Sequence, residues 1–449
     1  MMRELRALVG GEVLEPGEPG YAAACRPALA EFRSIRPRVV VRCGSAADVA
    51  AALGFARRAA LPVVPRGGGH CFAGRSSTEG ILLDLTPMRS VTVTPDGVAT
   101  VGAGARLADV YDGLDRHGLT LPAGCGSDVG IAGLALGGGL GLLGRRYGLT
   151  SDRLRAAQVV LTDGRIVDCD AAHHPDLFWA LRGAGGGQFG VVTSLVFDAV
   201  RVAAATRFVL TWDAAAAALV AAWQAWAPDA PDEVSANLKV TPARVIVFGA
   251  VLDAPTVARG LLDEFVALVG VRPVTASVAG MGYRALKGSL DGLGAPAEPP
   301  TDPVQVSRSE FVRRSLPADV VADLLDALGR DPVPGQHREL NFTPMGGAYN
   351  RVPADATAFV HRCERFLLEH VAVYGSGTPG AAGAPVAADW PHRSHGIAHP
   401  WASGRVYQNF PDPYLTDWAE AYHGPNHARL AGIKRAWDPQ RVLRFPQSL

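Results

Sequence analysis

The chain lacks an excess of charge of either sign. Its 449 residues include 43 basic and 43 acidic side chains, which gives a formal net charge of +0. Electrostatic binding to nucleic acid or to an anionic membrane surface needs an excess of lysine and arginine. We therefore expect no nucleic-acid partner and no membrane partner, and a neutral small molecule is the easier ligand to accommodate.

Long apolar runs are also missing. The longest, residues 131–144, is interrupted by five internal glycines and is shorter than the roughly 20 residues that a membrane-spanning helix needs. The N-terminal residues have no apolar core of the kind found in a secretory signal. These features predict a cytoplasmic protein, either a monomer or a homodimer, without a transmembrane helix.

Cysteine is scarce, and its six positions do not show the paired spacing of a metal site. Three histidines, His392, His395 and His399, are spaced by three and four residues, but they follow a proline and no carboxylate lies among them. Zinc sites built from histidine usually add cysteine or a carboxylate. We expect a solvated loop here and no metal site in the chain.

Glycine, by contrast, is abundant. The 52 glycines and 33 prolines occur without a low-complexity tract, which indicates many turns where the backbone approaches something closely, usually a ligand. The length predicts two or three domains. Short β-rich runs alternate with helical ones over residues 37–200, and residues 201–401 favour hairpins with helices on one face of a sheet. The fold class is therefore α+β.

Three glycine-rich motifs carry the chemistry. The first is PRGGGHCFAG, residues 65–74, which follows a short strand; its three glycines let successive N–H groups converge on an anion such as pyrophosphate, and His70 ends the run. The second covers residues 121–149, and its glycines are too frequent for a stable helix or strand, so we expect this segment to lie against a planar ring system. In the third, residues 177–193, a helix ends in glycines that lead into a strand. Turns and surface loops remain the alternative for each.

Together the motifs resemble the berberine-bridge-enzyme-like family of FAD-linked oxidases, which has the vanillyl-alcohol-oxidase or PCMH-type fold. RGGGHCFAG, VGIAGLALGGGLGLLGRRYGLTSD, DLFWALRGAGGGQFGVVTS, GGAYNRVPADATAFVHR and WDPQRVLRFPQS occur in that family's order and spacing. The resemblance implies an FAD-binding domain of residues 1–200, completed by residues 405–449. It also implies a substrate-binding domain of residues 201–404, with an antiparallel sheet covered by helices.

The resemblance also implies which residues hold the flavin. His70 matches the histidine that bonds covalently to FAD, and Val129 matches a position associated with oxygen access. The family's second attachment cysteine falls where Gly126 stands, so we expect one covalent bond, through His70, with Cys125 as a packing thiol, because a shift of one residue in extended backbone reverses the side chain. The full set of expected cofactor contacts is Arg66, Gly67, Gly68, Gly69, His70, Cys71, Gly74, Ala123, Gly124, Cys125, Gly126, Ser127, Val129, Gly130, Gly133, Gly138, Gly139, Gly190, Val191, Val192 and Asn409.

The catalytic base is harder to assign. A flavin oxidase needs a group that takes a proton while hydride leaves the substrate. Many relatives use two tyrosines, but Leu140 and Phe410 stand at those places. Other candidates are Tyr407, Glu339, Asn341 and Tyr349, and alternation would put Glu339, Asn341 and Thr343 on one face of a strand.

The expected activity is oxidation of a bulky, mostly apolar, natural-product-like small molecule, with dioxygen as the electron acceptor. Two alternatives stay open. One is a flavoprotein that binds or re-oxidises a toxic reduced compound and so confers resistance. The other is a flavin-dependent monooxygenase of a poly-carbonyl substrate.

Overall fold

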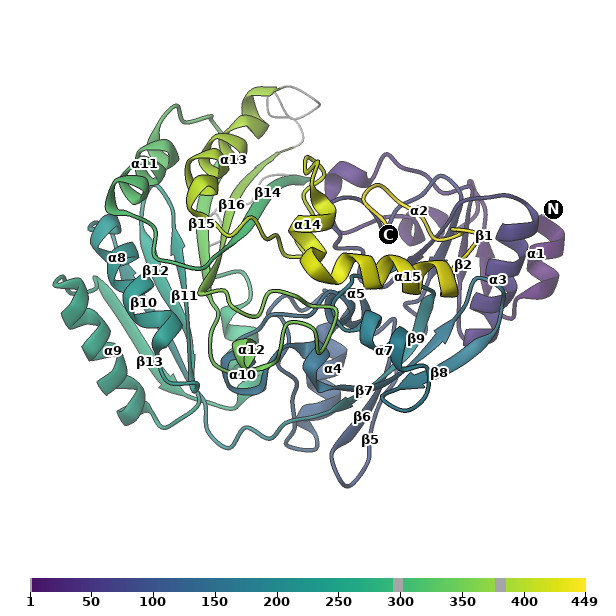
Figure 1. Cartoon of the computed structure of the whole chain (residues 1–449), viewed down its shortest axis with the longest axis horizontal. Coiled ribbons are helices and arrows are strands. Elements are labelled where there is room, and N and C mark those ends of the chain that lie inside the picture. The colour runs from purple at the N-terminus through teal and green to yellow at the C-terminus, as the bar shows by residue number, and fades with distance from the viewer. Residues whose placement is uncertain (1, 294–301, 376–384) are drawn as a thin grey trace.

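The computed structural model describes residues 2–293, 302–375 and 385–449, with side chains of 385–389 not described. Three β-sheets and their flanking helices make up the molecule, which confirms the α+β fold class (Figure 1). In these described segments no helix is both long enough and apolar enough to cross a membrane.

The first sheet has four strands in the order β1-β2-β4-β3, which are Glu12–Leu14, Val39–Arg42, Ile81–Asp84 and Val63–Arg66. The last three run parallel, and β1 joins β2 antiparallel. Helix α3 (Ala46–Arg58) makes the crossover, and its start is fixed by a capping box between Ser45 and Asp48. The first glycine-rich motif begins with the last two residues of β3, so this edge strand of the sheet fixes where its glycines start. Shorter helices α1 (Met2–Leu8), α2 (Tyr21–Ala24) and η1 (Ala30–Phe32) accompany this sheet.

The second sheet is antiparallel, with five strands in the order β5-β6-β9-β7-β8. Their bounds are Val91–Val93, Val98–Gly102, Val191–Asp198, Leu154–Val160 and Ile166–Asp170. Tight turns at residues 94–97 and 161–165 join β5 to β6 and β7 to β8, and in them Gly97 and Gly164 adopt positive φ angles of 86° and 93°. Helices α4 (Leu107–Asp115) and α7 (Pro175–Leu181) precede β7 and β9.

The second glycine-rich motif differs from its prediction, because it contains two short helices. They are α5 (Ile131–Leu136) and α6 (Gly144–Tyr147), followed by the 3-10 turn η2 (Thr150–Arg153). Ile131 and Ala135 are fully buried in the core of the first half. The prediction failed because tertiary burial of this face outweighs the unfavourable helix propensity of the single glycine inside α5.

The third sheet has seven antiparallel strands in the order β13-β10-β12-β11-β15-β16-β14. Their bounds are Thr275–Gly280, Thr206–Trp212, Val245–Val251, Val234–Val240, His337–Pro344, Phe366–Gly375 and Pro303–Val312. Helices α8 (Ala216–Trp226), α9 (Pro255–Val269), α11 (Ala318–Gly329) and α13 (Pro385–Ala398) cover its outer face, whereas the other face is turned toward the rest of the molecule (Figure 1). Elements η3 (Ala227–Asp229), α10 (Tyr283–Leu290), α12 (Ala348–Arg351) and η4 (His399–Trp401) connect the parts.

The C-terminal segment returns to the first half of the chain. It contains α14 (Trp418–His423), η5 (Gly424–Asn426) and α15 (His427–Trp437), drawn in yellow in Figure 1. The buried Lys434 of α15 donates to the backbone carbonyl of Gln188 at 2.5 Å and to Asp438 at 2.7 Å. Leu430 and Ile433 belong to the same apolar core as residues of the first two sheets. The division into a domain of residues 1–200 plus 405–449 and a domain of 201–404 stays a prediction.

Candidate functional site

A cavity of about 480 Å³ lies where the glycine-rich motifs, the C-terminal segment and the third sheet meet. All three motifs contribute to its wall, together with residues 407–411 and 443–445. Three side chains of the third sheet, Asn237, Thr343 and Leu367, also line it. The cavity therefore joins segments that are hundreds of residues apart, and it is the natural place for a cofactor and a substrate to meet.

The first motif is fixed beneath the cavity by Arg66, the last residue of β3. Arg66 is buried, and its guanidinium donates to the backbone carbonyls of Cys25 and Ser76, both at 2.8 Å. The following glycines are required by close packing and by backbone angle. A side chain at Gly68 would meet the backbone nitrogen of Gly130 at 2.3 Å, and Gly69 has a φ angle of +75°. This geometry carries the chain directly to His70 at the cavity wall.

His70 presents an imidazole nitrogen with no hydrogen bond. Its Nε2 lies 3.0 Å from an oxygen of Asp128, within ion-pair distance. The two groups are not aligned for a hydrogen bond, however, and within the described residues Nε2 has no hydrogen-bond partner. A buried polar atom of this kind is uncommon and needs a reason. A bond to a group held in the cavity would supply that reason.

Most glycines of the second motif lie close to other parts of the chain. A side chain at Gly141 would lie 2.1 Å from the carbonyl oxygen of Ala123, and one at Gly139 would lie 2.3 Å from the hydroxyl of Thr150. Gly133 is different, because a side chain there would meet nothing within 4 Å and would point into open space at the cavity. That this segment lies against a planar ring stays a prediction, and Gly133 is a position that leaves room for a ligand.

Cys125 lies at the cavity beside a buried lysine. The ammonium of Lys287, on α10, donates to the carbonyls of Ala123 and Gly124 at 2.9 and 2.6 Å, and it lies 3.3 Å from the sulfur of Cys125. Lys287 is 2% exposed. These contacts of Lys287 hold the segment before Gly126 in place. They also fix the position of the Cys125 thiol, which agrees with a packing role for that side chain.

Most of the expected cofactor contacts line the cavity. These are Gly67, Gly68, Gly69, His70, Cys71, Gly124, Cys125, Gly126, Val129, Gly130, Gly133, Gly190, Val191, Val192 and Asn409. The others are not part of the wall: Arg66, Gly74, Ala123, Gly138 and Gly139 pack or hydrogen-bond within the protein, and Ser127 is exposed. The motifs thus supply both the wall and the layer that supports it.

Tyr407 lines the cavity, but its phenol is hydrogen-bonded to backbone groups of the protein. The phenol oxygen accepts hydrogen bonds from the N–H groups of Gly139 and Leu140, at 3.1 and 3.2 Å, and from the amide of Asn409 at 2.9 Å. Burial raises the pKa of Tyr407 to about 12 despite these donors. The phenol is therefore protonated near neutral pH, and its geometry suits a positioning residue better than a base.

The other three candidates for the catalytic base do not line the cavity; they are Tyr349, Glu339 and Asn341. Tyr349 is buried, and its phenol is hydrogen-bonded to Gly141. Glu339 accepts from Lys239 at 2.8 Å and lies 3.1 Å from Nε2 of His337; burial opposes its charge, but these partners lower the pKa of Glu339 to about 2. Asn341 donates to Glu339 at 2.9 Å. Thr343, the next residue on this face, does reach the cavity.

Sequence reasoning did not single out Glu369, on β16, which lies just beyond the residues that line the cavity. Glu369 pairs across the sheet with Asn341, next to the Thr343–Leu367 pair that lines the cavity. It accepts a hydrogen bond from Ser307 at 2.6 Å and one from Asn341 at 3.5 Å. Burial raises its pKa to about 7. Alternation along β16 could have placed Glu369 on the face of Leu367, but the pairing with β15 is not visible in the sequence.

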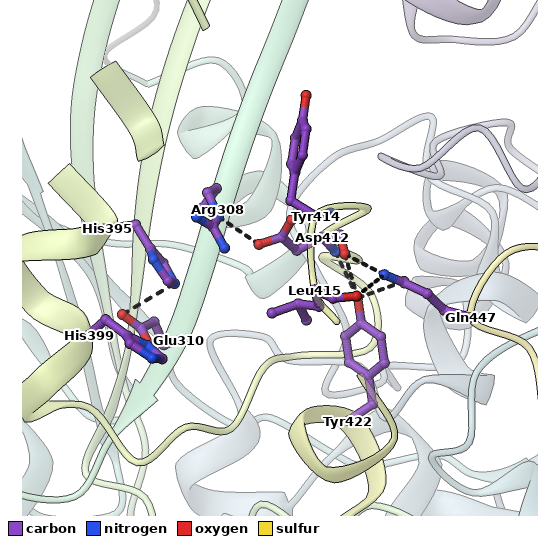
Figure 2. Close-up of polar contacts among 9 residues, drawn as sticks. All are labelled: Arg308, Glu310, His395, His399, Asp412, Tyr414, Leu415, Tyr422 and Gln447. Atoms are coloured by element: carbon purple, nitrogen blue, oxygen red, sulfur yellow. Dashed lines mark hydrogen bonds and ion pairs between the residues drawn. The ribbon is translucent and has the colours of Figure 1, made fainter. Parts of the chain in front are cut away.

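The three C-terminal histidines also differ from their prediction. His395 lies on α13 and is 5% exposed, so it is not in a solvated loop, and a carboxylate is present after all. Glu310, from β14, lies 3.3 Å from His395 and 2.7 Å from His399 (Figure 2). The local sequence could not show this contact, because 85 residues separate Glu310 from His395.

Comparison with known proteins gives a consistent picture. The family described as "FAD binding domain" matches residues 37–170, and "Berberine and berberine like" matches residues 406–449. The FAD-linked oxidoreductase YgaK of Bacillus subtilis is 32% identical over 450 residues, covering 98% of this chain and 96% of its own. The structure of BBE-like 1 from Physcomitrella patens is similar with a TM-score of 0.91 at 28% identity, covering 100% of this chain and 98% of that one.

A glucooligosaccharide oxidase from Acremonium strictum has the same fold. Its TM-score is 0.90 at 24% identity, covering 99% of this chain and 98% of that one. The flavin of that oxidase is a 6-S-cysteinyl, 8α-N1-histidyl FAD.

Proposed function

This chain belongs to the berberine-bridge-enzyme-like family of FAD-linked oxidoreductases, and we propose that it is an oxidase whose FAD is bonded covalently to His70. Its substrate in this proposal is a bulky, mostly apolar small molecule, and dioxygen is the electron acceptor. The observation that carries the attachment is the imidazole of His70, which lines the cavity and whose Nε2 receives no hydrogen bond from the part of the chain that the structure describes.

The cavity wall fits the cofactor. Gly67, Gly68 and Gly69 expose backbone without side chains at one side, and Gly133 leaves open space at another. Such stretches suit the close approach of a dinucleotide. Asp128, beside His70, could accept the imidazole proton when a ring nitrogen forms a bond. The second attachment point seen in some relatives falls on Gly126 here, which supports a single bond.

The attachment is tested by acid precipitation of the purified protein. We expect the yellow flavin of the wild-type chain to stay in the pellet, and that of His70→Ala to pass into the supernatant. Cys125→Ser is the matched control, because its side chain also lines the cavity, and it should keep the flavin in the pellet. Free flavin from the wild type, or release by Cys125→Ser alone, would overturn the assignment to His70.

The lining supports an apolar substrate. Phe72 and Phe410 stack with ring centroids 5.3 Å apart, and Leu140 and Leu367 complete this part of the wall. Leu140 and Phe410 stand where many relatives have the two phenols, so this surface binds by apolar contact and does not donate protons. A substrate with a wide hydrophobic body gains most from such a wall.

We assign the base to Glu369. When bound, FAD supplies the two-electron acceptor for an oxidation of this kind. Glu369 would take the proton from the substrate's oxygen or nitrogen, because its pKa of about 7 leaves it able to accept one at neutral pH. It lies two residues, about 7 Å, beyond Leu367 along β16, so the substrate would extend past the Thr343–Leu367 pair.

Substrate and base are tested together. A panel of apolar alcohols and amines is mixed with the enzyme under argon, and flavin bleaching is followed; air is then admitted and peroxide is measured. We expect Glu369→Gln to keep its flavin but to bleach at least about 100-fold more slowly. The control is Glu264→Gln, an exposed carboxyl on α9. Bleaching by Glu369→Gln at the wild-type rate would exclude this base.

The same experiment separates the alternatives. Steady peroxide release supports the oxidase. Tight binding without turnover would favour the resistance protein, and product that contains one oxygen atom from dioxygen would favour the monooxygenase.

A further inference from the structure

A second group of side chains with metal-binding chemistry lies away from the cavity. Glu310 projects from β14, His395 lies on the last turn of α13, and His399 opens η4. One ligand atom from each residue can be chosen so that all lie within 4.8 Å of one another. Figure 2 shows both imidazoles turned toward the Glu310 carboxylate, and none of the three lines the cavity.

The carboxylate of Glu310 is poorly supported by protein contacts alone. It is 1% exposed, and within the described residues its Oε1 has no hydrogen bond, although Nε2 of His395 lies 3.3 Å away. A buried carboxylate oxygen without a hydrogen bond is uncommon, and a cation bound beside Oε1 of Glu310 would supply the missing partner.

The neighbouring cation, Arg308, is not the partner of the Glu310 carboxylate. Arg308 lies two residues before Glu310 on β14, but its guanidinium donates to the buried Asp412 at 2.6 Å (Figure 2). Asp412 is 0% exposed, so it takes up the charge of Arg308. His370 packs edge-on against His395 with ring centroids 5.9 Å apart, and it is tied to Ser394 at 2.8 Å. His395 is thus held in position from behind.

We propose that Glu310, His395 and His399 bind a zinc ion. Two imidazole nitrogens and one carboxylate oxygen are ligands that Zn²⁺ prefers, whereas Ca²⁺ and Mg²⁺ favour sets made of oxygen only. The ion would replace the proton shared by His399 and Glu310, whose atoms are 2.7 Å apart. Three protein ligands leave a fourth position for water, and the side chain of His399 is 59% exposed, which gives the ion a route from solvent.

The site would clamp the covering helix to the sheet. Glu310 and Glu369 lie on opposite faces of neighbouring strands, since Ser309, the residue before Glu310, pairs with Glu369. Zinc at Glu310 would therefore bind on the helix-covered face, behind the strand that carries the proposed base. Its effect is expected on stability and not on flavin attachment, so this proposal does not depend on the proposed reaction.

The test is titration of the flavin-bound, full-length protein with Zn²⁺ alone, after dialysis against a chelator. We expect one tightly bound equivalent per chain by calorimetry and metal analysis, an increase in the melting temperature, and no displacement by millimolar Mg²⁺ or Ca²⁺. His399→Gln should fold, because that side chain is mostly exposed, and it should weaken binding by about 100-fold.

His392→Ala is the matched control, because His392 lies on the same helix but outside the ligand set. It should bind zinc as the wild type does. Glu310→Gln gives a second, independent variant if it folds, and it should also lose the ion. The proposal is overturned if the wild type binds no stoichiometric zinc, or if His399→Gln binds it as tightly as the wild type.

Discussion

Tyr349 and Gly141 exchange two hydrogen bonds. The N–H of Gly141 donates to the phenol oxygen at 3.0 Å, and the phenol donates to the carbonyl oxygen of Gly141 at 2.9 Å. Gly141 lines the cavity, whereas Tyr349 is 1% exposed. Both polar groups of the glycine are thus satisfied by one side chain that lies 208 positions further along the chain.

Replacing this phenol should loosen the cavity wall. Tyr349→Phe leaves the N–H and carbonyl of Gly141 without that partner, and we expect the free energy of unfolding to fall by about 1–3 kcal/mol. Tyr147→Phe is the control, since its exposed phenol donates one bond to Arg201 at 3.1 Å. Denaturant unfolding of both flavin-bound variants checks the difference. Equal decreases in the free energy of unfolding of the two variants would show that the two hydrogen bonds between Tyr349 and Gly141 contribute no more than the single bond of Tyr147.

A methyl group at Gly133 should separate folding from flavin binding. Alanine is favoured over glycine inside a helix by roughly 0.5–1 kcal/mol, and none of the residues that the structure describes obstructs it at this position. The methyl group would instead occupy cavity space, so Gly133→Ala should stay folded but hold less flavin. Gly260→Ala, an unobstructed glycine of α9, is the control. Flavin content per chain is the measurement. Full flavin occupancy in Gly133→Ala would contradict the placement of the flavin beside Gly133.

The pH profile should report Glu369. Burial raises its pKa to about 7, and a base acts in its ionised form, so kcat/KM should rise as pH passes about 7 and level off above it. Ser307→Ala removes a hydrogen bond that favours the charged form, so the midpoint should move to higher pH. A profile that is unchanged in Ser307→Ala would argue against Glu369 as the titrating group.

Glu339 and Glu369 should affect stability with opposite signs. The folded-state pKa of Glu339 is about 2, below its usual 4.5, so its contribution is present above pH 4.5 and is lost as pH falls toward 2. The folded-state pKa of Glu369 is about 7, so its contribution is present below pH 4.5 and is lost as pH rises through 7. Unfolding free energies of Glu339→Gln and Glu369→Gln between pH 2 and 8 measure this contrast. Parallel curves for the two variants would contradict the assigned shifts.

The sequence by itself determined the local elements and the three motifs. Short β-rich runs predicted strands within residues 37–200, and alternation predicted the strand that carries Glu339, Asn341 and Thr343. These inferences succeeded because hydrophobic periodicity and turn chemistry depend on residues close together in the chain.

Tertiary structure alone decided which distant side chains meet. Glu310 lies beside His395 and His399, and Glu369 beside Asn341, because strand register and helix packing place them there. It also decided that Tyr349 and Tyr407 bind backbone groups, and that most glycines of the second motif pack on protein while Gly133 opens into the cavity. A residue's neighbours across a sheet depend on how whole elements bury their apolar faces, and a local pattern does not encode that outcome.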